Sequence, residues 1–221
     1  MKNSLFNIPD WQMFAPTLVD RYSIEKGSDF DTLLANEEIN TDFFIQLITI
    51  FNSEHELPIE QLKSFPLPVI LDYLEKTHRY YINTKLNEIE QSITNLQKRI
   101  PENELLPFLV SFFEWVKQNL IFHIQMEEDQ LFPYIKALIA QVPVPATFSI
   151  QTFIDSHTDT IELQMSEVKK HIVRAQQTAS EIFPFRILLK QMNDFEKDLR
   201  IHAKIEDEVL IPLAKILEVC K

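Results

Sequence analysis

Glycine is almost absent from this chain, and Gly27 is the only one in 221 residues. Tight turns between β-strands depend on residues that tolerate positive φ, and glycine is the usual one. A β-rich fold would therefore lack its turn residues, whereas the abundant Leu, Ile, Glu, Lys and Gln favour helices. We expect an all-α protein, long enough for one domain with a substantial core.

Cysteine is equally scarce. Cys220 is the only one, so a disulfide cannot form within the chain. The first residues do not show a charged segment followed by an apolar run, which is the pattern of an export signal. Uninterrupted apolar runs also stay well below the roughly 20 residues that cross a bilayer. We therefore expect a cytoplasmic protein without a membrane partner.

Positive charge is the third deficit. The chain has 21 Lys and Arg against 33 Asp and Glu, which gives a net charge of -12. Recognition of phosphate groups requires concentrated Lys and Arg, and the sequence has no such cluster. We predict that nucleic acid is not a partner.

Helical periodicity divides what remains into four long stretches. Apolar residues recur at helical spacing over residues 69–99, 101–140, 150–172 and 184–210, with short connections between them. Such helices predict an antiparallel up-down four-helix bundle over residues 64–221. Residues 1–63 contain shorter apolar patches and predict a small helical N-terminal domain. Pro133 and Pro212 lie inside predicted helices, where proline favours a kink or an early end.

The most informative feature is a repeat of 79 residues. The segment FHIQMEEDQLFPYIK, Phe122 to Lys136, reappears as IHAKIEDEVLIPLAK, Ile201 to Lys215. The same offset relates three pairs of polar residues on apolar stripes: His78 with His157, His123 with His202, and Glu127 with Glu206. Residues at i and i+4 lie on one helix face, so each His-x-x-x-Glu directs both groups at the same place in the bundle.

This pattern predicts a metal site. A single histidine on an apolar face is usually a hydrogen-bonded core residue, but burying two ionised carboxylates without cations costs several kcal/mol. Mixed nitrogen and oxygen ligands suit iron first, with manganese or zinc as substitutes. The predicted ligands are His78, His123, Glu127, His157, His202 and Glu206. The neighbouring acids Glu128, Asp129, Asp207 and Glu208 are expected to be solvated or to contact the ligands from outside. Glu128 or Asp207 becomes a ligand itself if the helix deforms.

These residues resemble hemerythrin-like proteins over roughly residues 65–218. The resemblance implies a four-helix bundle that holds two non-haem iron ions with an oxo or hydroxo bridge. It further implies that His78 and His123 bind one iron, that His157 and His202 bind the other, and that Glu127 and Glu206 bridge them. The ferritin-like di-iron bundles instead use Glu-x-x-His on two helices. Only Glu75 to His78 has that order here, and Ile154 occupies the matching place, so that family is disfavoured.

One position separates the chain from the oxygen-carrying members. The chain resembles those proteins in the other ligands, but their third helix carries a second histidine. The matching position in this chain is Ile161. The remaining six ligands are similar to those of the iron-sulfur-cluster repair proteins of the same superfamily. That subgroup has a cysteine pair near its N-terminus, whereas this chain has Lys26, Gly27 and Ser28 at about that place.

The resemblance implies one of two functions. The first is binding of O2 or NO, or iron handling for iron-sulfur-cluster repair, in response to oxidative or nitrosative stress. The alternative is a di-iron redox enzyme of the peroxide or nitric oxide reductase type, and the sequence leaves open whether the protein is an enzyme. The N-terminal region could also provide contacts to a protein partner or to a second copy in a homodimer.

Overall fold

The structure is a computed structural model that describes residues 16–25, 28, 33, 36, 38–53, 55–144, 147–156, 165, 170 and 182–219. Within these residues the regular structure is helical throughout. The expectation of an all-α helical bundle with a small helical N-terminal appendage is therefore confirmed. The appendage contributes α1 (Pro16–Arg21), α3 (Thr41–Asn52) and α4 (Ile59–Leu62).

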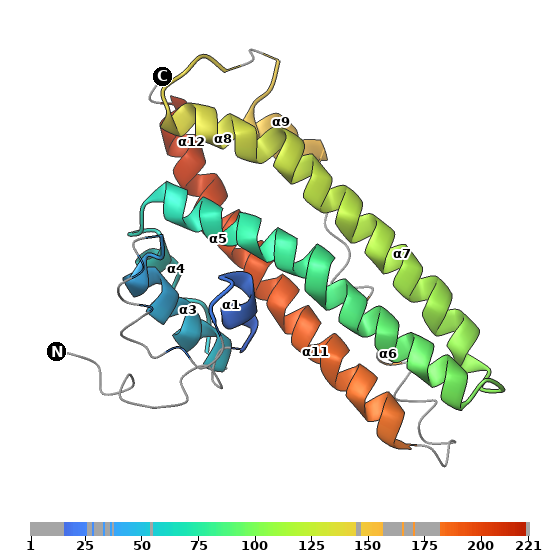
Figure 1. Ribbon diagram of the computed structural model, residues 1–221. Coiled ribbons are helices and arrows are strands. Elements are labelled where there is room, and N and C mark those ends of the chain that lie inside the picture. The colour runs from blue at the N-terminus through green and yellow to red at the C-terminus, as the bar shows by residue number, and fades with distance from the viewer. Residues whose placement is uncertain are drawn as a thin grey trace.

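Three long helical rods form most of the described bundle (Figure 1). The first joins α5 (Leu67–Tyr80), η3 (Tyr81–Lys85) and α6 (Leu86–Arg99). The second joins α7 (Leu105–Met126), η4 (Glu127–Leu131) and α8 (Phe132–Ile139), and the last joins α11 (Ile182–Ile205), η5 (Glu206–Leu210) and α12 (Ile211–Val219). The second and last rods run parallel to each other and antiparallel to the first (Figure 1). The predicted third helix begins as α9 (Ile150–Ser156), and most of its remainder lies outside the described residues.

Proline and asparagine mark where these helices begin and end. α5 follows Pro66 and has Pro68 in its first turn, where the missing N–H does not remove an intrahelical bond. The first rod ends at Arg99, just before Ile100 and Pro101, because a residue that precedes proline disfavours the α conformation. In the appendage, the side chain of Asn40 accepts a hydrogen bond of 3.0 Å from the Phe43 N–H and caps α3.

Pro133 and Pro212 do not end their helices early. Instead, each follows a π-helical segment, η4 and η5, after which an α-helix continues to Ile139 or Val219. In these segments the backbone hydrogen bond spans five residues, as from the Phe132 N–H to the Glu127 carbonyl. A proline ring clashes with the carbonyl four residues earlier in an α-helix, and the wider turn relieves that clash.

Two apolar cores lie one after the other along the bundle. One core joins the N-terminal helices to α5, η4, α8, the end of α11, η5 and α12, and contains Leu74, Leu131 and Ile205. The other joins η3, α6, α7 and α11, and contains Tyr81 and Ile124. His78 lies between Leu74 of the first core and Tyr80 of the second, and Glu127 lies between Ile124 of the second core and Leu131 of the first. On the last rod, Leu199 of the second core precedes His202 and Val209 of the first core follows Glu206. The polar residues therefore form a layer between two apolar regions.

The N-terminal helices pack on the bundle rather than standing apart from it. Leu18, Phe43 and Phe44 belong to the same core as Leu74 and Leu210. α1 and α3 lie beside α5 and α11 in Figure 1. This shared core brings the N-terminal region close to the polar layer. The division into domains at residues 63 and 64 stays a prediction.

The second rod is unusually apolar for a surface helix. The helix Leu105–Ile139 is long and apolar enough to cross a membrane by length and composition, with 28% of its most apolar window buried inside the protein. Phe108 and Phe122 are 45% and 62% exposed on it. The same helix carries Glu127, which is buried inside the protein. An apolar helix in a protein core passes the same test of length and composition. The expectation that a membrane is not a partner stays a prediction.

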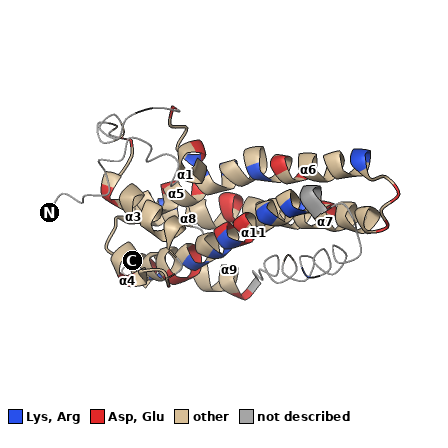
Figure 2. Cartoon of the chain, turned by 90° about the horizontal axis from the view of Figure 1, so that it is seen from below, with Lys and Arg blue, Asp and Glu red and all other residues tan. Residues whose placement is uncertain are grey.

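Charged side chains are interspersed over the outer turns of the bundle. Figure 2 shows acidic and basic residues alternating along α11, with both signs also present on α6. Some of these charges pair along one helix, as Lys190 does with Asp194 at 2.6 Å. Exposed pairs of this kind contribute little to stability.

Candidate metal centre

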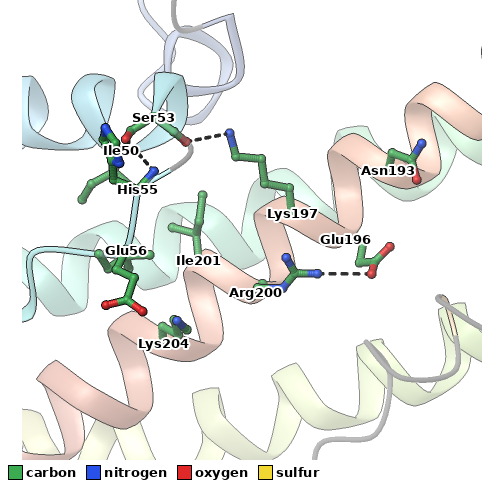
Figure 3. A pocket seen from close by; sticks show the side chains of 11 residues that line it. Ile50, Ser53, His55, Glu56, Asn193, Glu196, Lys197, Arg200, Ile201 and Lys204 are labelled. Carbon is green, nitrogen blue, oxygen red and sulfur yellow. Dashed lines mark hydrogen bonds and ion pairs between the residues drawn. The ribbon is translucent and has the colours of Figure 1, made fainter.

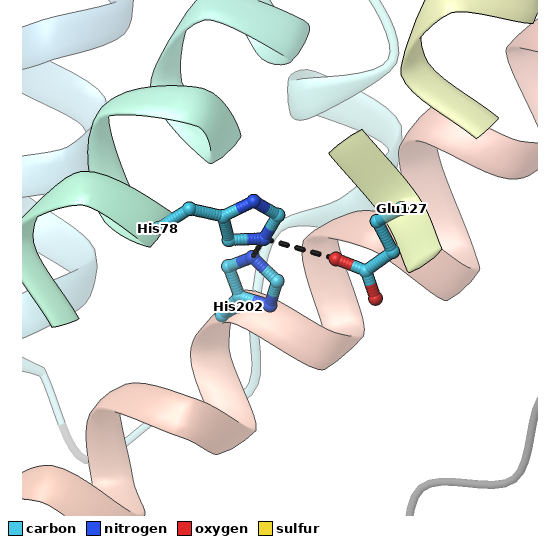
Figure 4. Close-up of side chains that lie close together, drawn as sticks. All are labelled: His78, Glu127 and His202. Atoms are coloured by element: carbon cyan, nitrogen blue, oxygen red, sulfur yellow. Dashed lines mark hydrogen bonds and ion pairs between the residues drawn. The ribbon is translucent and has the colours of Figure 1, made fainter. Parts of the chain in front are cut away.

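Three helices bring His78, Glu127 and His202 to one place (Figure 4). His78 lies in the last turn of α5, Glu127 is the first residue of η4, and His202 lies in the last turn of α11. All three residues are buried, and Glu127 has no exposed surface. Each helix contributes its residue from the stripe that faces the bundle interior, as the periodicity predicts.

The ligating atoms of this group converge. The Nε2 atoms of His78 and His202 are 3.0 Å apart, and His78 Nε2 is 2.9 Å from Glu127 Oε2. The His78 ring is also fixed from behind, because it stacks on Phe132 with the ring centroids 5.2 Å apart. A proton or a cation between these atoms would explain why two ring nitrogens face each other.

A second group shares Glu127 with the first. Its members are His123, Glu127 and Glu206, whose ligating atoms lie within 4.8 Å of one another. His123 Nε2 is 2.7 Å from Glu127 Oε1, the oxygen that does not contact His78. Glu127 therefore presents one carboxylate oxygen to each group. A carboxylate that bridges two metal ions has this arrangement.

The π-helical segments begin at the two glutamates. Glu127 opens η4 and Glu206 opens η5, so the segments keep the offset of 79 residues seen in the sequence. A third segment, η3, begins at Tyr81, three residues after His78. π-helical turns within α-helices occur frequently at functional sites, because the extra residue changes the direction of the side chains that follow. Here the change acts on the acids after Glu127 and Glu206.

Glu128 contacts the group from outside. Its Oε1 is 2.8 Å from His78 Nδ1, and its side chain is 35% exposed. A carboxylate that accepts from Nδ1 leaves the Nε2 lone pair free to bind a metal, and such outer contacts are the rule at histidine metal sites. The prediction that Glu128 contacts a ligand from outside agrees with this geometry. Asp129, Asp207 and Glu208 are exposed, as expected for solvated acids.

The two histidines of the first group differ in proton affinity. Burial lowers the pKa of His78, but hydrogen bonds to Glu127 and Glu128 outweigh burial and raise the pKa above the ordinary value of 6.5. Burial, followed by the nearby His78, lowers the pKa of His202 well below that value. In the metal-free protein a proton shared by the two rings is therefore held by His78 in preference to His202. A divalent cation would displace that proton, because metal binding requires neutral imidazole.

The residues present fit a metal centre. Imidazole nitrogen and carboxylate oxygen are ligands of first-row divalent metals, and bonds of about 2.1 Å at right angles place neighbouring ligand atoms about 3.0 Å apart. The atoms around His78 Nε2 are 2.9 and 3.0 Å away. Two buried carboxylates, Glu127 at 0% and Glu206 at 4% exposure, supply the negative charge that such cations need.

The structure brings together five of the six predicted ligands. The sixth, His157, lies outside the described residues, as does Ile161. The observed groups differ from the pairing that the resemblance implies, because His78 faces His202 and does not share a group with His123. His157 is part of the implied pairing, so both the pairing and the role of each ligand stay predictions.

A buried ion pair that the sequence did not reveal lies next to this centre. Arg21 of α1 pairs with Asp198 of α11, and their side chains are 0% and 3% exposed. Tyr81 Oη donates a hydrogen bond of 2.8 Å to Asp198 Oδ1. One signal was available, since Asp198 precedes His202 by four residues and therefore lies on the same face of α11. The partner Arg21 could not be found, because it is 177 positions away in the sequence.

A cavity of about 500 Å³ opens between the N-terminal region and α11. Figure 3 shows Lys197, Arg200 and Lys204 of α11 on one side, with Ser53 and His55 on the other. Lys197 Nζ donates a hydrogen bond of 3.3 Å to the Ser53 carbonyl across the cavity. The residues of the two ligand groups do not line this cavity, so it is separate from the metal centre.

Comparison with known proteins agrees with this geometry. Residues 69–214 match the hemerythrin HHE cation-binding domain, and this span covers more than half of the chain and all six predicted ligands. No curated protein sequence matches the chain significantly. The buried histidines and glutamates lie within the matched span, on helices that form the predicted bundle. The chain therefore belongs to the hemerythrin family and carries its cation-binding domain.

Proposed function

We propose that the chain binds two non-haem iron ions between its buried histidines and glutamates. We further propose that it acts in oxidative or nitrosative stress, through binding of O2 or NO or through iron handling for iron-sulfur-cluster repair. The observation that carries the proposal is the position of Glu127, whose two oxygens lie 2.9 Å from His78 Nε2 and 2.7 Å from His123 Nε2. A carboxylate with one oxygen in each group suits a pair of ions better than a single ion.

Iron is favoured by the ligand chemistry. The described groups offer three imidazoles and two carboxylates, a mixed set that suits iron, manganese or zinc. When bound, iron supplies coordination positions for small ligands and a change of oxidation state. The chain's own residues hold the site in place: Glu128 orients His78, and Phe132 stacks on the His78 ring.

The low exposure of the metal-binding residues favours a small bound molecule over a bulky substrate. The side chain of His78 is 2% exposed, and that of Glu127 is not exposed. The side chain of His123 is 13% exposed, so solvent reaches the cluster from the side of α7. Such limited exposure suits O2, NO or peroxide better than a larger molecule.

The test is reconstitution with ferrous iron without air, followed by metal analysis and absorption spectroscopy. The iron-loaded protein is then exposed separately to O2, NO and peroxide, and zinc-loaded protein serves as the redox-inactive control. We expect a spectral change that saturates at a fixed ratio of ligand to protein. Repeated consumption of peroxide or NO by each chain would instead favour the redox enzyme. Iron-loaded protein that responds to none of the three would contradict the proposal.

A further inference from the structure

We propose that Arg21, in the N-terminal helix α1, is a positioning residue for the metal centre and acts through Asp198 and Tyr81 on His202. This inference rests on the proposed metal site. It adds that the N-terminal region, which supplies none of the predicted ligands, contributes to the geometry of the centre. Figure 1 shows α1 beside α5 and α11, the helices that carry His78 and His202.

Arg21 is fully enclosed by the bundle. Its guanidinium donates a hydrogen bond of 3.1 Å to Tyr73 Oη and pairs with Asp198 Oδ2. It also lies over the rings of Phe51 and Tyr80, with centroid distances of 5.0 and 4.9 Å. Cation–π contacts of this kind are strongest where water is excluded. The side chain therefore has a single defined place, between the N-terminal helices and the bundle.

Asp198 connects Arg21 to a residue of another helix. Its Oδ2 meets Arg21, and its Oδ1 accepts a hydrogen bond of 2.8 Å from Tyr81 Oη. Tyr81 follows His78 on the first rod by three residues, and Asp198 precedes His202 on the last rod by four residues. The Tyr81–Asp198 bond therefore joins the two rods within one turn of the level where His78 and His202 meet.

Tyr81 then contacts the ligand itself. Its ring lies against the ring of His202, with the centroids 5.8 Å apart and the planes at 55°. The His202 ring also lies against that of His78, at 4.9 Å and 41°. His202 thus contacts two rings of the first rod, that of its partner in the first group and that of Tyr81. Tyr81 cannot shift without changing the space available to His202.

A purely structural role explains this arrangement poorly. Replacing a buried ion pair with apolar side chains of similar volume is often neutral or stabilising, whereas a charge pair with fixed geometry specifies one arrangement of the elements around it. Without Arg21, Asp198 would be a buried carboxylate without its cation, and it would have to attract water or a proton. Either change weakens or redirects the bond to Tyr81 and loosens His202.

The experiment compares four single variants with the wild type. Arg21→Met removes the charge but keeps the length, Arg21→Lys keeps the charge, and Tyr81→Phe removes only the hydroxyl. Leu18→Ala is the matched control, because Leu18 lies on the same helix, is 0% exposed and is apolar. Cobalt(II) and iron(II) are the probes. The measurements are affinity by chelator competition, the absorption spectrum of the cobalt form, and the unfolding temperature.

We expect Arg21→Met and Tyr81→Phe to lower metal affinity about 10- to 100-fold, the usual effect of losing an outer contact, and to change the cobalt spectrum. Arg21→Lys should recover part of both. Leu18→Ala should lower the unfolding temperature but leave affinity and spectrum as in the wild type.

Two results would count against different claims. If Arg21→Met and Tyr81→Phe bind metal with the affinity and spectrum of the Leu18→Ala control, Arg21 only stabilises the fold and the inference is wrong. If the wild type itself does not bind iron or cobalt, the proposed function fails first. Should Arg21→Met not fold, Arg21→Lys and Tyr81→Phe still decide the question, because each keeps Asp198 beside a polar or charged partner.

Discussion

Glu127 offers the sharpest test of a two-ion centre, because it is shared by both ligand groups. Glu127→Gln keeps the volume of the side chain and removes its charge. Glu206→Gln makes the same change at a residue that, among the described residues, belongs to one group, and Glu128→Gln makes it at a residue that contacts His78 Nδ1 from outside. Asp129→Asn, at an exposed position in the same segment, is the control.

The structure predicts an order for these variants. Loss of an outer contact usually lowers metal affinity about 10- to 100-fold, or about 1.4–2.7 kcal/mol, and this is the range expected for Glu128→Gln. Glu206→Gln should reduce the metal content from about two ions to about one, because the described group of His78, Glu127 and His202 keeps its three residues. Glu127→Gln removes a ligand from both groups, so both ions should be lost together. Asp129→Asn should bind metal as the wild type does.

Thermal unfolding gives an independent readout. Metal at about 100 times its dissociation constant stabilises a protein by about 2.7 kcal/mol, which for a chain of this size raises the unfolding temperature by roughly 5–11 °C. This increase should be present in the wild type and absent in Glu127→Gln.

The measurements are iron per chain after anaerobic reconstitution, chelator competition, and unfolding with and without metal. Equal losses of bound metal in the Glu127, Glu206 and Glu128 variants would refute the reasoning, because each of the three residues is expected to contribute differently to metal binding. Loss of a single ion in Glu127→Gln would show that this carboxylate does not bridge.

Three further predictions follow from the sequence and the structure. Iron-reconstituted wild type should hold about two ions per chain, and protein that never exceeds one ion would rule out a dinuclear centre, whereas bound zinc would not. The reduced protein should autoxidise within minutes in air, because the resemblance implies that Ile161 stands where the oxygen carriers have a histidine, and a long-lived reversible O2 complex would contradict this. All five tyrosines have raised pKa values, through burial first, and that of Tyr73 rises to about 12. The folded state therefore keeps protons that unfolded tyrosines lose near pH 10, so stability is present below about pH 10 and falls as pH rises toward the folded pKa values. Absorbance at 295 nm should then rise together with unfolding, and tyrosinate formation near pH 10 in folded protein would contradict the prediction.

The sequence alone determined the helical class and the residues that meet in the polar layer. One glycine and unbroken helical periodicity left little room for strands, and the offset of 79 residues paired His123 with His202 and Glu127 with Glu206. These features are local, because an i, i+4 pair on an apolar stripe must face the interior of any bundle that it joins. Position along a helix was therefore sufficient to find them.

Only the tertiary structure decided how these residues combine. Helical geometry places Glu127 on an inner face, but the way the rods pack gives one of its oxygens to His78 and the other to His123. Hydrophobic periodicity also could not predict how the helices accommodate Pro133 and Pro212, because a π-helical turn and an early end both relieve the same clash. The contact of Arg21 with Asp198 joins residues 177 positions apart, and sequence spacing carries no information about such a pair. That contact depends on how the N-terminal helices pack on the bundle, which is why the Arg21–Asp198 pair became visible only in the fold.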